Sequence, residues 1–149
     1  MKTYKTNLPQ ITLKLKKGEE LNCQIKCSQD CADLMRKIWD CDSLPIYESV
    51  ICIFLNRQNR TLGWYKVSQG GLTGSLIDVR LILSIALSCL ATGIVIAHNH
   101  PSGGLQPSDA DKDITKKLRD SANIMDISVI DHIILTETGH YSFSDENTL

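Results

Sequence analysis

The sequence predicts an α/β domain in which a mixed central β-sheet is flanked by helices. Short apolar runs rich in β-branched residues, at 50–55, 93–97 and 127–135, are typical of buried strands. Segments at 77–91 and 109–123 instead repeat their apolar residues with the period of an amphipathic helix. Strand-like and helix-like segments therefore alternate along the chain, which is the pattern of a layered α/β fold.

Length and charge restrict the function classes. The chain has 149 residues, enough for one domain with a sizeable core, and we expect a single domain over residues 1–149. A formal net charge of −1 gives no general attraction to nucleic acid, so direct binding to it is not expected. No apolar run has the length of a membrane span, and the first residues carry no apolar secretion signal. We therefore expect a cytoplasmic protein without a membrane partner.

The N-terminal part is expected to form a β-hairpin. Two stretches within residues 1–27 alternate apolar and polar side chains on either side of a turn at 17–20. The core with its functional site is then expected over residues 28–149. Ser28 is predicted to cap a helix over residues 29–39, whose apolar side chains recur on one side.

The predicted central strand is the apolar run at 50–55, and Glu48 stands just before it. Residues 61–67 are predicted to return antiparallel to this strand. A glycine-rich loop at 68–75 follows. Its glycines either allow a substrate chain to approach the backbone closely or serve only as turn residues.

The predicted helix at 77–91 has Asp78 near its start and Arg80 in its first turn. A cation at this end of a helix is mildly unfavourable because it faces the positive end of the helix dipole. Arg80 is therefore expected either to form a salt bridge or to hold a substrate carboxylate, and the sequence leaves both uses open.

The stretch after the strand at 93–97 carries the candidate chemistry. His98 and His100 are two residues apart on an extended backbone, so their side chains point the same way. Pro101 ends the strand, and the glycines at 103–104 allow the chain to reverse. The two imidazoles can therefore converge on one point at the end of a strand.

Ser108 and Asp111 mark the start of the helix that follows. Ser108 is expected at the N-cap and Asp111 at the third helical position. Taken alone, this pair predicts a capping box, in which Asp111 accepts a hydrogen bond from the Ser108 backbone N–H. Together with the two histidines it also offers a third ligand. Imidazole and carboxylate ligands suit Zn²⁺, and three protein ligands leave a fourth position for water, as in catalytic zinc sites.

The pattern His-x-His-Pro, six residues, then Ser-x-x-Asp resembles the JAMM metal-binding motif of the JAB/MPN metalloproteases. The fuller string at 98–103 is similar to the bacterial RadC family, and the resemblance extends from about Glu48 to Phe143. It implies the three-layer JAB/MPN architecture, which is cytidine-deaminase-like. One departure is that residues 79–81 are Val-Arg-Leu where the family usually has Pro-Arg-Glu, so any function of that glutamate is in doubt.

The resemblance implies a role for each site residue. His98, His100 and Asp111 become the ligands of one Zn²⁺ per chain. Ser108 becomes the hydroxyl beside the reacting carbonyl, and Glu48 becomes the general acid/base. The implied activity is that of a zinc metalloprotease that cleaves an amide or isopeptide bond in a peptide or protein substrate. A homodimer is left open.

Two other functions were compared with that of a zinc metalloprotease. The RadC family carries a DNA-repair label, so the domain could instead be a non-catalytic or partner-recruiting module in DNA transactions. Zinc nucleobase deaminases need His-x-Glu with a later Cys-x-x-Cys, and the sequence contains neither pattern.

The polar pair Asp131 and His132 inside the strand at 127–135 either supports the metal site or is satisfied within the core.

Overall fold

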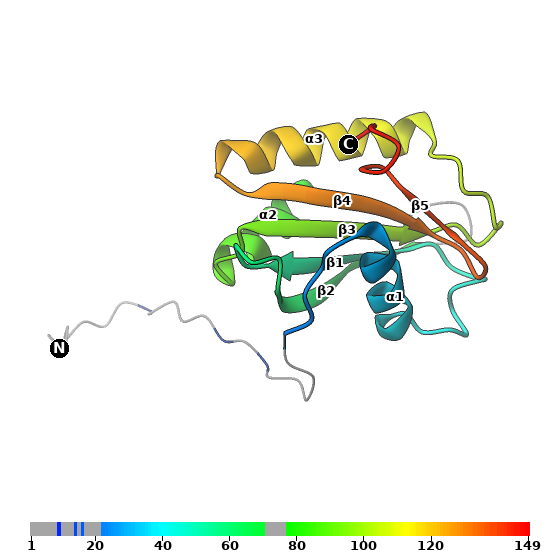
Figure 1. Ribbon diagram of the computed structural model, residues 1–149, viewed down its shortest axis with the longest axis horizontal. Helices are drawn as coiled ribbons and strands as arrows, with labels where there is room; N and C mark the ends of the chain where they lie inside the picture. The colour runs from blue at the N-terminus through cyan, green and yellow to red at the C-terminus, as the bar shows by residue number, and fades with distance from the viewer. Residues whose placement is uncertain (1–8, 10–13, 15, 17–21, 71–76) are drawn as a thin grey trace, which may run out of the picture.

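The computed structural model describes the chain except for residues 1–8, 10–13, 15, 17–21 and 71–76 (Figure 1). None of the helices in the described part is long and apolar enough to cross a membrane. The elements follow one another as α1 (Ser28–Ile38), β1 (Ser49–Leu55), β2 (Thr61–Gln69), α2 (Val79–Ser88), β3 (Gly93–Asn99), α3 (Asp109–Ile124), β4 (Ser128–Leu135) and β5 (His140–Ser142).

The five strands form one mixed sheet in the order β2-β1-β3-β4-β5. β1 pairs antiparallel with β2 and β3, β3 pairs parallel with β4, and β4 pairs antiparallel with β5. Parallel neighbours need a crossover connection, which α3 supplies between β3 and β4. The predicted mixed sheet flanked by helices is confirmed.

Two apolar clusters cover the opposite faces of the sheet. Val50 and Phe54 of β1 pack with residues of α2 and α3, whereas Ile51 and Ile53 pack with residues of α1. Because both faces are covered, β1 and β3 are buried along their whole length. The result is a three-layer arrangement of α1, the sheet, and the pair α2 and α3 (Figure 1).

The predicted N-cap of the first helix is wrong. Ser28 is already the first residue of α1, and its hydroxyl donates to Asp145 at 2.5 Å. The Asp30 carboxylate instead accepts from the backbone N–H groups of Lys26 and Cys27 at 2.8 and 3.2 Å. The Asp30 side chain in the first turn therefore fixes the backbone just before the helix. Its negative charge is also favoured at this end by the helix dipole.

Helix α2 ends earlier than its apolar pattern predicts. Leu90 adopts a left-handed conformation with φ of 57°, and the Ala91 N–H donates to the Ala86 carbonyl at 2.8 Å. This hydrogen bond closes the helix in the manner of a Schellman motif. The chain can then turn directly into β3.

Two predicted segments lie largely outside the described residues: the hairpin over 1–27 and the glycine-rich loop over 68–75. In the described part before α1, Gln24 forms an isolated antiparallel bridge with Arg60. The Thr61 N–H donates to the Cys23 carbonyl at 2.9 Å. The chain that leads into α1 therefore contacts the start of β2.

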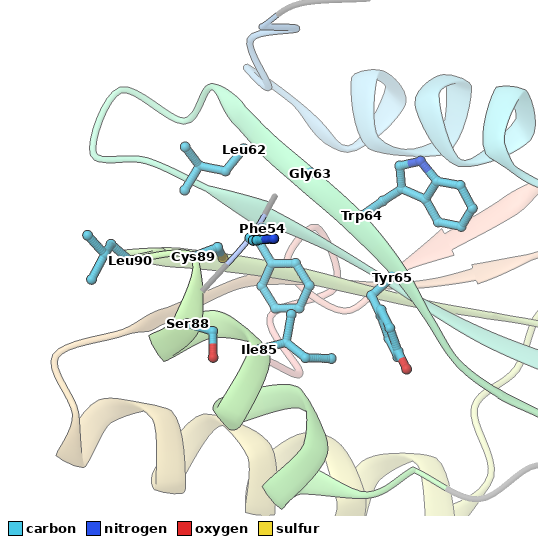
Figure 2. A pocket seen from close by; sticks show the side chains of 10 residues that line it. Phe54, Leu62, Gly63, Trp64, Tyr65, Ile85, Ser88, Cys89 and Leu90 are labelled. Atoms are coloured by element: carbon cyan, nitrogen blue, oxygen red, sulfur yellow. The ribbon is translucent and has the colours of Figure 1, made fainter. Parts of the chain in front are cut away.

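An apolar hollow of about 500 Å³ lies between β2 and the end of α2 (Figure 2). Its lining includes Phe54, Leu62, Tyr65 and Ile85. Figure 2 shows Tyr65 on the side of α2, and Trp64 turned the other way. Its lining includes no residue of the His-x-His-Pro and Ser-x-x-Asp motif, so the hollow is separate from the candidate chemistry.

The packing of α1 predicts a large effect of Met35→Ala. Met35 is 0% exposed and belongs to the cluster between α1 and the sheet. The substitution leaves a cavity, so we expect a loss of about 2–5 kcal/mol in the free energy of unfolding, measured by urea titration. Met125 is 47% exposed, and Met125→Ala is the matched control with an expected change within about 0.5 kcal/mol. Equal effects of the two substitutions would contradict the assigned core.

Candidate metal centre

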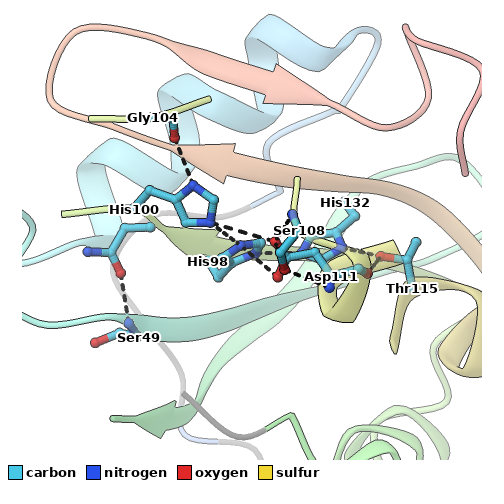
Figure 3. Close-up of polar contacts among 9 residues, drawn as sticks. Ser49, His98, His100, Gly104, Ser108, Asp111, Thr115 and His132 are labelled. Atoms are coloured by element: carbon cyan, nitrogen blue, oxygen red, sulfur yellow. Dashed lines mark hydrogen bonds and ion pairs between the residues drawn. The ribbon is translucent and has the colours of Figure 1, made fainter. Parts of the chain in front are cut away.

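The carboxyl end of β3 and the amino end of α3 bring three predicted ligands together (Figure 3). His98 lies near the end of β3, His100 follows the strand, and Asp111 lies in the first turn of α3. The His98 Nε2 atom lies 3.0 Å from His100 Nε2 and 3.3 Å from Asp111 Oδ1. His100 Nε2 lies 3.7 Å from Asp111 Oδ2. The three side chains thus present their ligand atoms to one point.

The spacing of these atoms fits a tetrahedral zinc ion. Two ligand atoms that each lie about 2.0–2.1 Å from zinc at the tetrahedral angle are about 3.3 Å apart. The separations of 3.0 Å between the two imidazole nitrogens and 3.3 Å between His98 Nε2 and Asp111 Oδ1 lie close to this value. Two imidazole nitrogens and one carboxylate are also the donor types of catalytic zinc sites. The residues present therefore fit the metal that the motif implies.

The orientation of His100 is fixed by a backbone carbonyl. Its Nδ1 atom lies 2.7 Å from the Gly104 carbonyl oxygen, which only accepts hydrogen bonds. Nδ1 must therefore carry a proton and donate it. In the neutral imidazole this leaves Nε2 with a free lone pair, directed at His98 and Asp111.

A buried relay fixes the tautomer of His98. The Thr115 hydroxyl donates its proton to the Asp111 carbonyl at 2.5 Å, so its oxygen accepts from His132 Nδ1 at 2.6 Å. His132 Nε2 is then unprotonated and accepts from His98 Nδ1 at 2.7 Å. Burial lowers the pKa of His132 well below its usual value, which keeps this imidazole neutral. The relay leaves His98 Nε2 with the lone pair that a metal ligand needs.

The pair Asp131 and His132 splits between the two faces of the sheet. His132 supports the metal centre and stacks on Phe143 with ring centroids 4.6 Å apart. Asp131 accepts from the Ser142 hydroxyl at 2.6 Å and from the Ser144 N–H at 3.0 Å. Neighbours in a strand point to opposite faces, so only one of the two can reach His98. The supporting role therefore belongs to His132, and Asp131 is satisfied elsewhere.

The charge of Asp111 dominates the electrostatics of the site. Burial alone would raise the pKa of this carboxyl, but the His100 and His98 imidazoles, which donate hydrogen bonds to it when Nε2 is protonated, hold it well below its usual range. The same hydrogen bond to Asp111 is the main cause that raises the pKa of His100. The site therefore holds a fixed negative charge and favours a cation, either a proton or a metal ion, on the facing nitrogens.

Ser108 and Asp111 form the predicted capping box and at the same time complete the ligand set. The Ser108 N–H donates to Asp111 Oδ2 at 2.7 Å, and Ser108 Oγ accepts from the Asp111 N–H at 3.1 Å. The Ser108 hydroxyl donates to the same Oδ2 at 2.8 Å. Oδ1 remains directed at His98. The two expected uses of this pair are compatible because they employ different carboxylate oxygens.

Glu48 comes just before β1, near the end of β3 that carries the two histidines. β1 runs antiparallel to β3 with Val50 opposite His98. The printed pairs end there, and Glu48 comes just before the first residue of β1. Glu48 is partly buried, and its charge adds to the Asp111 hydrogen bond in raising the pKa of His100. This effect indicates that the Glu48 carboxylate lies near His100.

Arg80 lies at the start of α2 and pairs with Asp78. The Arg80 guanidinium is 3.4 Å from the Asp78 carboxylate, and its side chain is 93% exposed. Of the two uses that the sequence left open, the described contacts show the salt bridge. An ion pair this exposed contributes little to stability.

The family model for a RadC-like JAB domain matches residues 25–148. The chain belongs to the RadC family. A UPF0758 protein of Flavobacterium johnsoniae is 43% identical over 134 residues, which are 90% of this chain and 54% of that protein. A UPF0758 protein of Chlorobaculum parvum is 36% identical over 132 residues, which are 89% of this chain and 58% of that protein. This RadC-like JAB domain therefore spans little more than half the length of these relatives.

The relay behind His98 predicts the effect of His132→Ala on zinc binding. Without His132, the His98 ring loses the acceptor that fixes its tautomer, and we expect zinc affinity to fall about 10–100-fold. Competition with a chromophoric chelator measures this affinity. His140→Ala is the matched control, because His140 lies in β5 and belongs to no metal-binding group of the described residues. Unchanged zinc affinity in His132→Ala would remove the relay from the site.

Proposed function

We propose that this RadC-like JAB domain is a zinc-dependent hydrolase of the JAMM type that cleaves an amide or isopeptide bond. The observation that carries the proposal is the convergence of His98 Nε2, His100 Nε2 and the Asp111 carboxylate at distances that suit one zinc ion. The membership of the RadC family and the neighbouring carboxylate of Glu48 support it. The proposed substrate is a peptide or a protein.

The metal and Glu48 divide the chemistry between them. Zinc bound by three protein ligands would supply Lewis acidity and would lower the pKa of a bound water to about 7. Glu48 acts as the general base that takes a proton from the attacking water. It then acts as the general acid that returns the proton to the leaving amine. The effect of its charge on the pKa of His100 supports this role, because it indicates that the carboxylate lies close to the proposed metal position.

Ser108 supplies a hydrogen-bond donor to the carbonyl oxygen of the substrate. Ser108 is exposed at the rim of the site, and its hydroxyl donates to Asp111 Oδ2. When substrate binds, the hydroxyl turns its proton from Asp111 to the developing oxyanion. Its oxygen keeps the hydrogen bond from the Asp111 N–H that fixes its position. One well-placed donor of this kind stabilises the transition state by roughly 3–4 kcal/mol.

The proposal predicts that Glu48→Gln retains zinc and loses hydrolysis. Glutamine has the shape of glutamate but cannot accept the proton of the attacking water. We therefore expect about one zinc per chain in both proteins and a rate about 10²–10⁴-fold lower in the variant. The measurements are metal analysis and a screen of peptide and isopeptide substrates with zinc-loaded protein.

The exposed Glu146 offers a matched control, and Glu146→Gln should leave the rate unchanged. An unchanged rate in Glu48→Gln would move the acid/base role to another residue. If no substrate is cleaved and an electrophoretic mobility assay shows a DNA complex at physiological salt, the hydrolase proposal fails. The alternative of a DNA-associated module would then be favoured.

A further inference from the structure

A buried amide side chain stands between the two histidine ligands. Asn99 is the last residue of β3 and is 0% exposed. Successive residues of a strand point to opposite faces, so Asn99 points away from the metal centre that His98 and His100 form. The chemistry proposed above gives this residue no role, although it lies in the middle of the motif.

Three of the four hydrogen-bonding positions of the Asn99 amide are used, including both N–H donors. Its Oδ1 atom accepts from the Ser49 N–H at 2.7 Å, the contact drawn as a dashed line from Ser49 in Figure 3. Its Nδ2 group donates to the carbonyls of Leu44 and Tyr47 at 2.6 and 2.8 Å. One N–H and two carbonyls can be satisfied by only one orientation of the amide, so its rotation is fixed.

Two of these contacts enclose Glu48. The Tyr47 carbonyl belongs to the peptide group before the Glu48 Cα atom, and the Ser49 N–H belongs to the peptide group after it. We propose that Asn99 is a positioning residue that holds the backbone of Glu48 in register with His98 and His100. This inference rests on the hydrolase function proposed above. It adds a link between the strand that carries the ligands and the acid/base.

The need for such a link follows from the local structure. The ladder between β1 and β3 ends at the pair Val50 and His98, so Glu48 lies beyond it. The residues before Glu48 form turns, and Ile46 and Tyr47 are exposed. The Gly70 N–H donates to the Glu48 carbonyl, which ties it to the end of β2 rather than to β3. The Asn99 amide joins the peptide groups on both sides of Glu48 directly to the strand that carries the histidines.

The substitution Asn99→Asp tests the role. Aspartate has nearly the same size and can still accept from the Ser49 N–H, but it cannot donate to the Leu44 and Tyr47 carbonyls. We expect zinc content and KM to be close to those of the wild type, because His98, His100 and Asp111 are retained. We expect kcat to fall about 10²-fold, because a misplaced base loses its attack geometry.

A double-mutant cycle separates positioning from general damage. If Asn99 acts through Glu48, Asn99→Asp should have little effect on the residual rate in the Glu48→Gln background. Ser142→Ala is the control for the loss of a buried hydrogen bond, because Ser142 is buried in β5 and its hydroxyl donates to Asp131. It should lower stability and leave kcat unchanged. If Asn99→Asp does not fold, the uncharged Asn99→Ser replaces it in every measurement.

Hydrogen exchange provides a measurement that does not depend on activity. In Asn99→Asp we expect the Ser49 amide to exchange about tenfold faster than in the wild type, whereas amides in the centre of β3 remain protected. Equal exchange in the two proteins, an unchanged kcat, an equal loss of rate in both backgrounds, or loss of zinc would each overturn the positioning role. A wild type that hydrolyses nothing but shows the expected exchange would contradict the proposed function and leave the backbone contact standing.

Discussion

The position of β3 between β1 and β4 determines the geometry of the whole candidate site. β3 is buried along its full length, and hydrogen-bonded strands on both sides fix its register. Its carboxyl end carries His98 and His100, and every other part of the site is placed relative to that end. The antiparallel neighbour brings Glu48, the parallel neighbour brings His132, and the crossover helix brings Asp111. A shift of β3 by one residue would turn both histidines to the opposite face.

Hydrogen bonds within the protein hold the ligands in place. The capping box orients the Asp111 carboxylate, and the Gly104 carbonyl and His132 orient the two imidazoles. Negative charge is also favoured at the amino end of α3, where Asp111 lies. Side chains ordered in advance lose less conformational entropy when they bind a ligand. The same contacts that complete the fold therefore lower the cost of binding a metal ion.

The sequence predicted what depends on local periodicity and missed what depends on distant partners. The convergence of His98 and His100 follows from the two-residue period of a strand, and the place of Asp111 follows from the start of a helix. Periodicity also implies that Asp131 and His132 face opposite sides, but it cannot say which of them meets His98, 34 residues away. The N-cap prediction at Ser28 failed because its hydroxyl has a partner 117 residues away, which no local pattern contains.

Backbone groups are a second reason why sequence reasoning is incomplete. The partners of Asn99 are carbonyls and an N–H in the segment before β1, and backbone groups have no signature in the sequence. Helix α2 likewise ends where Leu90 takes a left-handed conformation that its side chain disfavours, so propensity predicts a longer helix. The residues that carry the proposed chemistry and its support, from Leu44 to Phe143, nevertheless all lie inside the matched residues 25–148. The proposed reaction therefore draws on no side chain outside the JAB domain, although the relatives are nearly twice as long as the part that this chain matches.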